Sequence, residues 1–167
     1  MDKIIDTKIE NFTLRFAKES DVDIILGFIK ELAAYEKMSE QVTTTKEILE
    51  ESLFHRNVAE VIIGEYYNKP VGFMLFFYNF STFIGKPGIY LEDLYINEDM
   101  RNKGFGKVML SYLAKLTVKR DCKRLEWACL KWNEPSIQFY KKLGAIAMDE
   151  WTTYRLTGAK LKELANK

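Results

Sequence analysis

IYLEDLYI (residues 89–96), RNKGFGKVMLS (101–111) and RLEWACL (124–130) are the stretches that decide the predicted fold. The first and last are rich in β-branched and aromatic residues, which is typical of strands. Between them, two glycines precede an apolar run with the repeat of a helix, from about Gly106 to Lys119. Strand, glycine turn, helix and strand make a βαβ unit. We therefore expect the two strands to be parallel and adjacent, or nearly so.

Further apolar runs extend this unit into a sheet. The alternation of Phe12, Leu14 and Phe16 with polar residues predicts a first strand. VAEVIIGEYY (58–67) and VGFMLFFYNF (71–80) are expected to form an antiparallel meander with IYLEDLYI. AIAMDE and TTYRL, within 145–156, are expected to complete the sheet.

Helix caps mark the remaining elements. Ser20 and Asp21 predict the start of a helix that runs toward Glu36. Residues 44–47 resemble a capping box that opens a shorter helix. NEPSIQFYKKLG (133–144) has Asn as cap, Pro in its first turn and Gly as stop. The predicted fold class is mixed α/β, with a twisted, mostly antiparallel sheet, one splayed parallel pair, and helices on both faces.

Composition limits the possible functions. The 167 residues are 47% hydrophobic and carry a formal charge of +1, so we expect a single domain over 1–167 without a nucleic-acid partner. Cys122, Cys129 and the single histidine His55 give no metal-ligand cluster by sequence, and reduced thiols fit a cytoplasmic protein. The absence of a signal segment or a long apolar run predicts no membrane partner.

The glycine turn poses a question of ligand chemistry. Backbone N–H groups and the dipole at a helix N-terminus favour an anion such as phosphate. Gly104 and Gly106 would let its oxygens approach the backbone, and Arg101, Lys103 and Lys107 could neutralise its charge. A tight strand-to-helix turn beside solvated cations is an equally good interpretation of these residues alone.

Two nucleotide-binding motifs do not fit this turn. The Walker pattern requires Gly at position 101 or 102 and Ser or Thr after Lys107, where the chain has Arg101, Asn102 and Val108. A dinucleotide fingerprint requires a third glycine near position 109, which is Met109.

The Arg-x-x-Gly-x-Gly turn after the fourth predicted strand, followed by helix, strand and Asn-capped helix, resembles the GNAT superfamily of acyl-CoA-dependent N-acetyltransferases. The segments IKELAAYEKMSEQV (29–42), GKPGIYLEDLYI (85–96) and WNEPSIQFYKKLGA (132–145) resemble its diamine (spermidine/spermine) and thialysine acetyltransferase branch. The resemblance implies acetyl-CoA as cosubstrate, no metal, and a homodimer that could exchange strands through residues 145–156. It implies cofactor contacts at Leu94, Tyr95, Ile96, Arg101, Asn102, Lys103, Gly104, Phe105, Gly106, Lys107, Asn133 and Ser136.

Glu92 is the candidate proton acceptor for the attacking amine. Strict strand alternation would place Tyr90, Glu92, Leu94 and Ile96 on one face, with the carboxylate near the carboxyl end of the strand. The resemblance implies that Glu92 acts through a water. From the residues alone, a solvated or ion-paired strand-end carboxylate is the simpler interpretation.

Tyr140 is the candidate acid for the leaving thiolate, because a phenol with a pKa near ~10 can protonate a thiolate whose conjugate acid has a pKa of about 8.5. Core packing is the alternative role for a tyrosine at this position. Carboxylates and an aromatic residue could bind a cationic amine, although most such acids are simply solvated. The candidates are Glu31, Glu92, Asp93, Glu126, Trp127 and Glu150.

The choice of amine stays open at this point. Ser81 and Thr82 stand where polyamine enzymes have an Asp-Pro pair, and this resembles the thialysine acetyltransferases. Alternatives are a related enzyme acting on a protein N-terminus, a lysine or an antibiotic amine, and a non-catalytic acyl-CoA-binding module. A covalent mechanism through Cys129 is a poor second, since no histidine lies near it in sequence.

Overall fold

The computed structural model of the chain describes residues 4–167. The chain divides into two compact units. The N-terminal unit extends to Ala128, and the C-terminal unit comprises Cys129–Lys167.

One mixed sheet organises the N-terminal unit. Among the described residues it has six strands in the order of the chain, and the pairs are antiparallel except for the last, which is parallel. The strands are β1 (Ile5–Asp6), β2 (Phe12–Phe16), β3 (Glu60–Tyr66), β4 (Lys69–Ser81), β5 (Lys86–Ile96) and β6 (Leu125–Trp127). The predicted meander, the parallel pair and the mixed α/β class are confirmed, although β1 was not predicted and β6 is shorter than RLEWACL.

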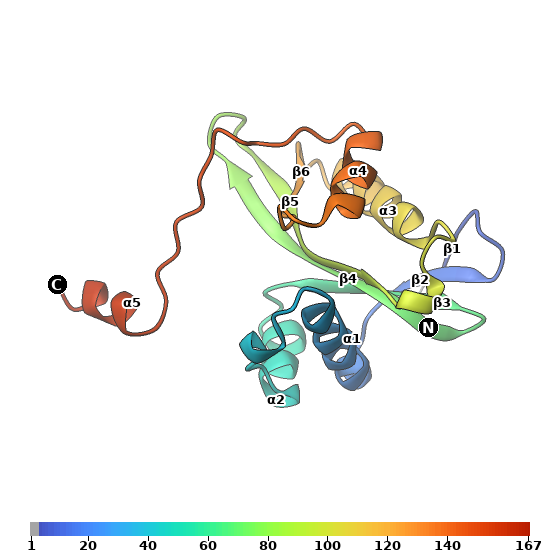
Figure 1. The fold of residues 1–167 in the computed structure, drawn as a ribbon, viewed down its shortest axis with the longest axis horizontal. Helices are drawn as coiled ribbons and strands as arrows, with labels where there is room; N and C mark the ends of the chain where they lie inside the picture. The colour runs from blue at the N-terminus through green and yellow to red at the C-terminus, as the bar shows by residue number, and fades with distance from the viewer. Residues whose placement is uncertain (1–3) are drawn as a thin grey trace. The chain divides into compact units, whose positions relative to one another are not determined.

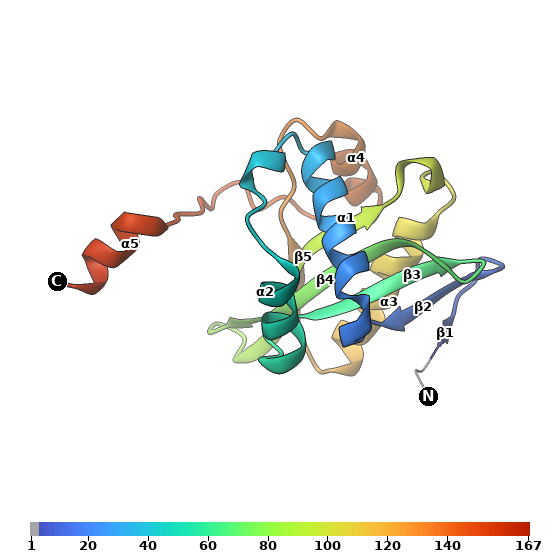
Figure 2. The same ribbon diagram turned by 90° about the horizontal axis from the view of Figure 1, so that it is seen from below.

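Helices cover both faces of this sheet, as predicted (Figures 1 and 2). One face carries α1 (Val22–Tyr35) and α2 (Lys46–Glu50), which continues into a π-helical turn over Glu51–His55. The other face carries α3 (Phe105–Lys119). Short 3-10 turns lie at Glu19–Asp21, Ser39–Gln41 and Glu98–Met100. Among residues 4–167, each helix is too short or too polar to span a bilayer.

Aromatic stacking joins the helices to the sheet. On the α1 side, the rings of Phe28 and Phe73 stack with centroids 5.6 Å apart. Elsewhere in the core, Phe105, the first residue of α3, stacks on Phe12 of β2 at 4.1 Å. Because Phe105 is fully buried, the start of α3 and the turn before it are fixed against the sheet.

The C-terminal unit contains α4 (Glu134–Lys142) and α5 (Gly158–Ala165). The predicted cap of α4 is confirmed, because Asn133 accepts a hydrogen bond from the Ser136 amide and Gly144 ends the helix with φ +86°. The predicted strands in residues 145–156 are wrong, since this segment has no regular secondary structure.

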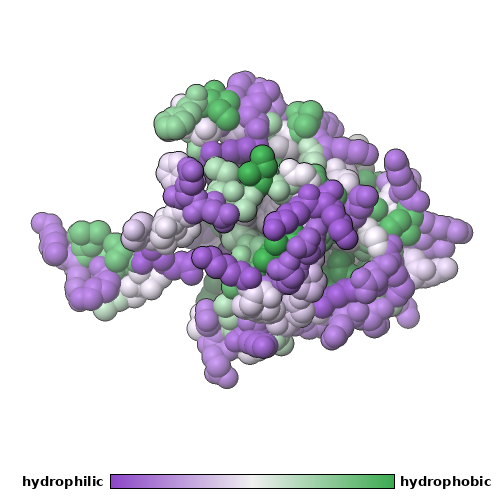
Figure 3. All heavy atoms as spheres, turned by 45° about the horizontal axis from the view of Figure 1, so that its top comes forward, coloured by the Kyte–Doolittle hydropathy of each residue, from purple (hydrophilic) through white to green (hydrophobic). Residues whose placement is uncertain are grey.

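The physical reason for this error is the lack of a pairing partner. Within residues 4–167 no strand pairs with the 145–156 segment, so its apolar residues cannot be buried by sheet formation. Trp151 is 73% exposed and Tyr154 is 92% exposed. In Figure 3 apolar side chains appear as separate groups on a mostly hydrophilic surface.

A buried ion-pair network fixes the start of α1. Arg15 of β2 donates to both carboxylate oxygens of Asp21 at 2.6 and 2.9 Å, and to Glu65 of β3 at 2.9 Å. The sequence predicted that Asp21 caps α1, but its side chain makes no capping hydrogen bond. In addition to the bonds from Arg15, it accepts a hydrogen bond from the Lys18 backbone amide. Burial disfavours the charged carboxylate, but these hydrogen bonds outweigh it and lower the pKa of Asp21.

We expect Asp21→Asn to destabilise the fold by about 3 kcal/mol, because it leaves the buried Arg15 without its bidentate partner. Urea unfolding at pH 7 measures this loss. The control is Asp23→Asn in the first turn of α1, which removes an exposed ion pair with Lys46 of α2 and should cost less than about 1 kcal/mol. Equal losses in the two variants would contradict a central role for the buried network.

Candidate functional site

A β-bulge lies at Glu92 in the middle of β5. Leu91 pairs with Phe76 of β4 and Asp93 pairs with the neighbouring Leu75, so Glu92 is the extra residue with no partner on β4. Bulges interrupt the alternation of side chains and are common next to active sites. Glu92 is exposed at this bulge.

The bulge corrects one prediction. Directly opposed residues share a face of the sheet, and Tyr90 pairs with Phe77 whereas Leu94 pairs with Met74. Because Phe77 and Met74 are three positions apart on β4, they lie on opposite faces. Tyr90 and Leu94 therefore do not share a face with each other, as strict alternation had predicted. The extra residue at the bulge reverses the pattern.

Asp93 consequently faces the α1 side. Its partner Leu75 packs against the apolar cluster around α1, as does Tyr95 two residues further on. Burial raises the pKa of Asp93 to about 6, and the neighbouring charges of Glu92 and Glu36 add to this rise. Burial also raises the pKa of Glu36, just after α1. The α1 side of β5 is thus a place where carboxylates accumulate and a cation would be favoured.

The end of β5 has a free edge. β6 pairs with β5 only from Ile89 to Leu91 and ends at Trp127, whereas β5 continues to Ile96. Among the described residues, the stretch Glu92–Ile96 therefore has β4 as its strand partner on one edge and no strand on the other. Leu94, Tyr95 and Ile96, the predicted backbone contacts for acetyl-CoA, lie in this stretch.

The glycine turn follows the free edge and begins α3. Asn102 and Gly104 have left-handed backbones, with φ of +62° and +84°, and Gly104 is the residue before the first turn of α3. A Cβ atom added at Gly106 would meet none of the described residues within 4 Å, so packing against them does not require a glycine there. An approaching ligand would provide a reason, and the backbone N–H groups of this helix start can bind an anion.

The side chains of the turn have different surroundings. Lys107 is exposed, and the Lys103 ammonium donates to the Asp99 carbonyl at 2.8 Å. Phe105 is buried, so it can offer a ligand only its backbone. Arg101 points back toward the sheet, where its Nε donates to the Ile96 carbonyl at 3.0 Å.

Within the N-terminal unit, the predicted amine-binding residues come from three elements, α1, β5 and β6. Glu31 on α1 hydrogen-bonds the hydroxyl of Tyr95, whose pKa is raised first by burial and then by this contact. Glu126 of β6 is already engaged, since it pairs with Arg124 at 2.8 Å and accepts from Asn79 at 2.6 Å. Trp127, beside it, is half-buried.

Four predicted site residues belong to the C-terminal unit. Asn133 is buried and caps α4 by accepting a hydrogen bond from the backbone amide of Ser136. Tyr140 lies in the last turn of α4, with its ring 5.3 Å from that of Phe139. Glu150 is exposed in the irregular segment. The capping role of Asn133 is therefore observed directly.

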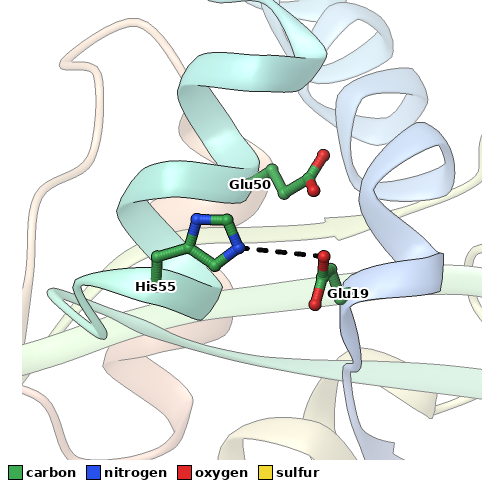
Figure 4. A group of neighbouring side chains, drawn as sticks. All are labelled: Glu19, Glu50 and His55. Atoms are coloured by element: carbon green, nitrogen blue, oxygen red, sulfur yellow. Dashed lines mark ion pairs between the residues drawn. The ribbon is translucent and has the colours of Figure 1, made fainter.

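One group of side chains has metal-ligating chemistry (Figure 4). The ligand atoms of Glu19, Glu50 and His55 lie within 4.8 Å of one another on the surface beside α2. Sequence reasoning had not brought these residues together, because the π-helical turn that carries His55 has no sequence signature. His55 is 3.0 Å from Glu51 and 3.8 Å from Glu19, and the hydrogen bond with Glu51 raises its pKa. The contacts of His55 with Glu19 and Glu51 are surface ion pairs when the imidazole is protonated.

A surface depression of about 360 Å³ lies between β1 and α3 and contains none of the predicted site residues. It is lined by Ile4, Ile5, Asp6, Tyr112, Lys115, Leu116 and Lys119.

The fold and the turn define an acyltransferase class, and comparisons with known proteins agree. Residues 26–145 match the model of the acetyltransferase (GNAT) family. Thialysine N-epsilon-acetyltransferase of Sus scrofa is 37% identical over 168 aligned residues, which cover 92% of this chain and 97% of that protein. The chain belongs to the GNAT family and is an N-acetyltransferase, close to the thialysine and diamine N-acetyltransferases.

Solved structures share the fold. An integron cassette protein from the mobile metagenome of V. cholerae superposes with a TM-score of 0.79 at 24% identity, over 95% of this chain and 100% of that chain. A predicted acetyltransferase from Clostridium acetobutylicum, solved with acetyl-CoA, gives a TM-score of 0.72 at 21% identity, over 86% of this chain and 96% of that chain.

Sequence reasoning missed the bulge and the orientation of Arg101. The signal for the bulge was present in LEDL, where Leu91 and Leu94 are three positions apart and two adjacent acids separate them. Neither spacing fits a regular strand. Nothing in the sequence indicates which side chain Arg101 contacts.

We expect Asp93→Asn to stabilise the folded protein at neutral pH. A carboxyl with a pKa raised from 3.8 to about 6 in the folded state is ionised more easily when unfolded, so the stability contributed by its protonated form is lost as pH rises from about 4 to 6. The advantage of the variant should grow by about 3 kcal/mol between pH 4 and 7. Denaturant unfolding at several pH values measures it.

Asp99→Asn, at an exposed position, is the control and should show no such growth. A difference between Asp93→Asn and the wild type that does not change with pH would mean that Asp93 is not held in a desolvated, acidic environment.

Proposed function

We propose that this N-acetyltransferase uses acetyl-CoA to acetylate the primary amine of a thialysine-like amino acid or a short diamine, by direct attack in a ternary complex. The observation that carries the proposal is the sequence of features at the end of β5. A strand edge that has no strand partner among the described residues leads into a glycine turn that opens a helix, and a Cβ added at Gly106 would meet none of these residues within 4 Å.

The turn fits a diphosphate. The N–H groups at the start of α3 and the helix dipole favour an anion, and Lys103 and Lys107 add positive charge at its rim. The backbone groups on the free edge of Leu94–Ile96 could hydrogen-bond to the extended arm of the cosubstrate, which would take the place of a further strand. Acetyl-CoA supplies the acetyl group as a thioester, and the GNAT neighbour solved with acetyl-CoA supports this choice of cosubstrate.

The carboxylates on the α1 side would hold the amine. Burial and the charges of Glu92 and Glu36 raise the pKa of Asp93 and so destabilise its carboxylate. A substrate ammonium beside Asp93 would offset this cost and would itself be stabilised. Glu31, on the same side, adds negative charge. Glu126, which is already paired with Arg124, is the weakest of the predicted substrate contacts.

Two residues would move protons. Glu92, exposed at the bulge, would accept the proton of the amine through a water, and Tyr140 would protonate the departing thiolate. When the amine attacks the thioester carbon, the C–N bond forms and the C–S bond breaks. The second proton that the nitrogen loses in this step would replace the proton that Tyr140 gives to the thiolate. Backbone N–H groups of the β5 edge would stabilise the charge that develops on the carbonyl oxygen.

Ser81 and Thr82 favour the thialysine-like substrate over long polyamines. A polyamine carries two or more charges and benefits from an additional carboxylate, which these positions lack. The 37% identity to a thialysine N-epsilon-acetyltransferase supports the same choice.

We propose that both units act as one acetyltransferase domain, because the family match at residues 26–145 crosses the boundary after Ala128. The exposed apolar residues of the 145–156 segment would be buried in a homodimer. The composition fits a cytoplasmic protein without nucleic-acid or membrane partners.

Two variants separate cosubstrate binding from chemistry. Gly106→Leu places a side chain where the diphosphate would lie, and should weaken the affinity for coenzyme A by about tenfold or more. Tyr140→Phe should leave this affinity within twofold and lower kcat by about a hundredfold. Calorimetric titration with coenzyme A and a thiol-release assay with thialysine, lysine, putrescine, spermidine and peptide amines provide the two measurements.

Gly27→Leu is the matched control, since Gly27 also lies in a helix and a Cβ added there would likewise meet no described residue within 4 Å. It should change neither quantity. Normal coenzyme A affinity in Gly106→Leu would overturn the diphosphate assignment, and an unchanged kcat in Tyr140→Phe would remove Tyr140 from the mechanism. Turnover of peptide amines alone would contradict the small-amine substrate.

A further inference from the structure

We propose that Tyr35, the last residue of α1, is a positioning residue for the phosphate-binding turn, and that it acts through Arg101. This inference rests on the proposed use of acetyl-CoA. Tyr35 would link the helix that carries the amine-binding acids to the turn that binds the cosubstrate.

The contact is a cation–π interaction. The Arg101 guanidinium carbon lies 4.5 Å from the centroid of the Tyr35 ring and 5.5 Å from that of the Tyr95 ring. Both distances are within the about 6 Å over which a cation is attracted to an aromatic face. The two rings come from different elements, the end of α1 and the end of β5, so Arg101 connects both of them to the turn.

A hydrogen bond fixes the stem of the same side chain. Arg101 Nε donates to the carbonyl of Ile96, the last residue of β5, at 3.0 Å. The side chain therefore folds back across the start of the turn instead of extending into solvent. Arg101 is therefore not a solvated cation beside the turn, as the sequence suggested. Its contacts fix the point at which the turn leaves β5.

Tyr95 connects Arg101 to the α1 side of β5, where the proposed amine-binding carboxylates lie. The Tyr95 hydroxyl is hydrogen-bonded to Glu31 and also to Arg101. Glu31 lies four residues before Tyr35 and so on the same side of α1. Arg101 thus connects the turn to Tyr35 directly and to Glu31 through Tyr95. Movement at the end of α1 would therefore be transmitted to the proposed diphosphate site.

Tyr35 is suited to hold Arg101 because its ring is fixed at a helix end and is only partly exposed, at 36%. The C-terminal end of a helix carries partial negative charge, which also favours a guanidinium there. Without the ring, Arg101 keeps its bond to Ile96 but loses one of the two aromatic faces that fix its plane.

The test compares Tyr35→Leu, which removes the ring, with Tyr35→Phe, which keeps it. We expect Tyr35→Leu to weaken the binding of coenzyme A about fivefold and to raise the KM for acetyl-CoA equally. Its kcat at saturation should stay within twofold, because the variant alters cosubstrate binding and not the proton transfers. Tyr35→Phe should restore wild-type affinity.

A double-mutant cycle shows whether Tyr35 acts through Arg101. In an Arg101→Leu background, Tyr35→Leu should have no further effect on coenzyme A affinity. The matched control is Tyr78→Leu, which removes another tyrosine ring from an arginine, at 5.6 Å from Arg120, and should leave the affinity unchanged. Thermal unfolding confirms that each variant is folded.

The possible outcomes separate the two proposals. If the wild type binds no coenzyme A, the proposed function fails and this inference fails with it. If the wild type binds but Tyr35→Leu binds equally well, only the inference is overturned. The inference is also overturned if Tyr35→Leu weakens coenzyme A binding further in the Arg101→Leu background. The same holds if Tyr35→Phe loses as much affinity as Tyr35→Leu.

Discussion

The structure depends on one constraint, which is that β5 is paired along both edges only as far as Leu91. Beyond this point β6 has ended, and within residues 4–167 the backbone of β5 has a strand on its β4 edge alone. A bulge at Glu92 occurs at the same place. The free edge, the reorientation of Asp93 and the approach to the glycine turn all follow from this interruption of the sheet. The antiparallel meander that holds the other edge of β5 keeps the free edge in an extended form.

Charge is sorted around this interruption. Carboxylates gather on the α1 side, where burial and mutual repulsion raise the pKa of Asp93 to about 6. Cations gather at the turn, where Arg101 is held by aromatic rings and a carbonyl. A buried acid of this kind lowers the stability of the empty protein, whereas a buried pair such as Arg15–Asp21 is satisfied within the fold. Asp93 therefore differs from Asp21, whose charge is paired within the fold.

The sequence predicted the elements that local chemistry determines. The meander, the helix after Gly104, the Asn133 cap and the parallel pair follow from alternation, caps and the βαβ rule. It failed where distant contacts decide. The 145–156 segment has strand-forming residues but lacks a pairing partner among residues 4–167, and the bulge at Glu92 depends on how β4 and β5 pair. The contact of Arg101 with Tyr35 depends on packing between α1 and β5, which spacing along the chain does not encode.

Backbone amide chemical shifts, followed by NMR while the wild-type protein is titrated with coenzyme A, test the central claim most directly. The account predicts that the largest changes occur at Gly104–Lys107 and along Leu94–Ile96, where the turn and the free edge offer their N–H groups. It would be contradicted by changes concentrated elsewhere, for example at Tyr112 and Leu116 in the depression between β1 and α3, with the turn and the end of β5 unaffected.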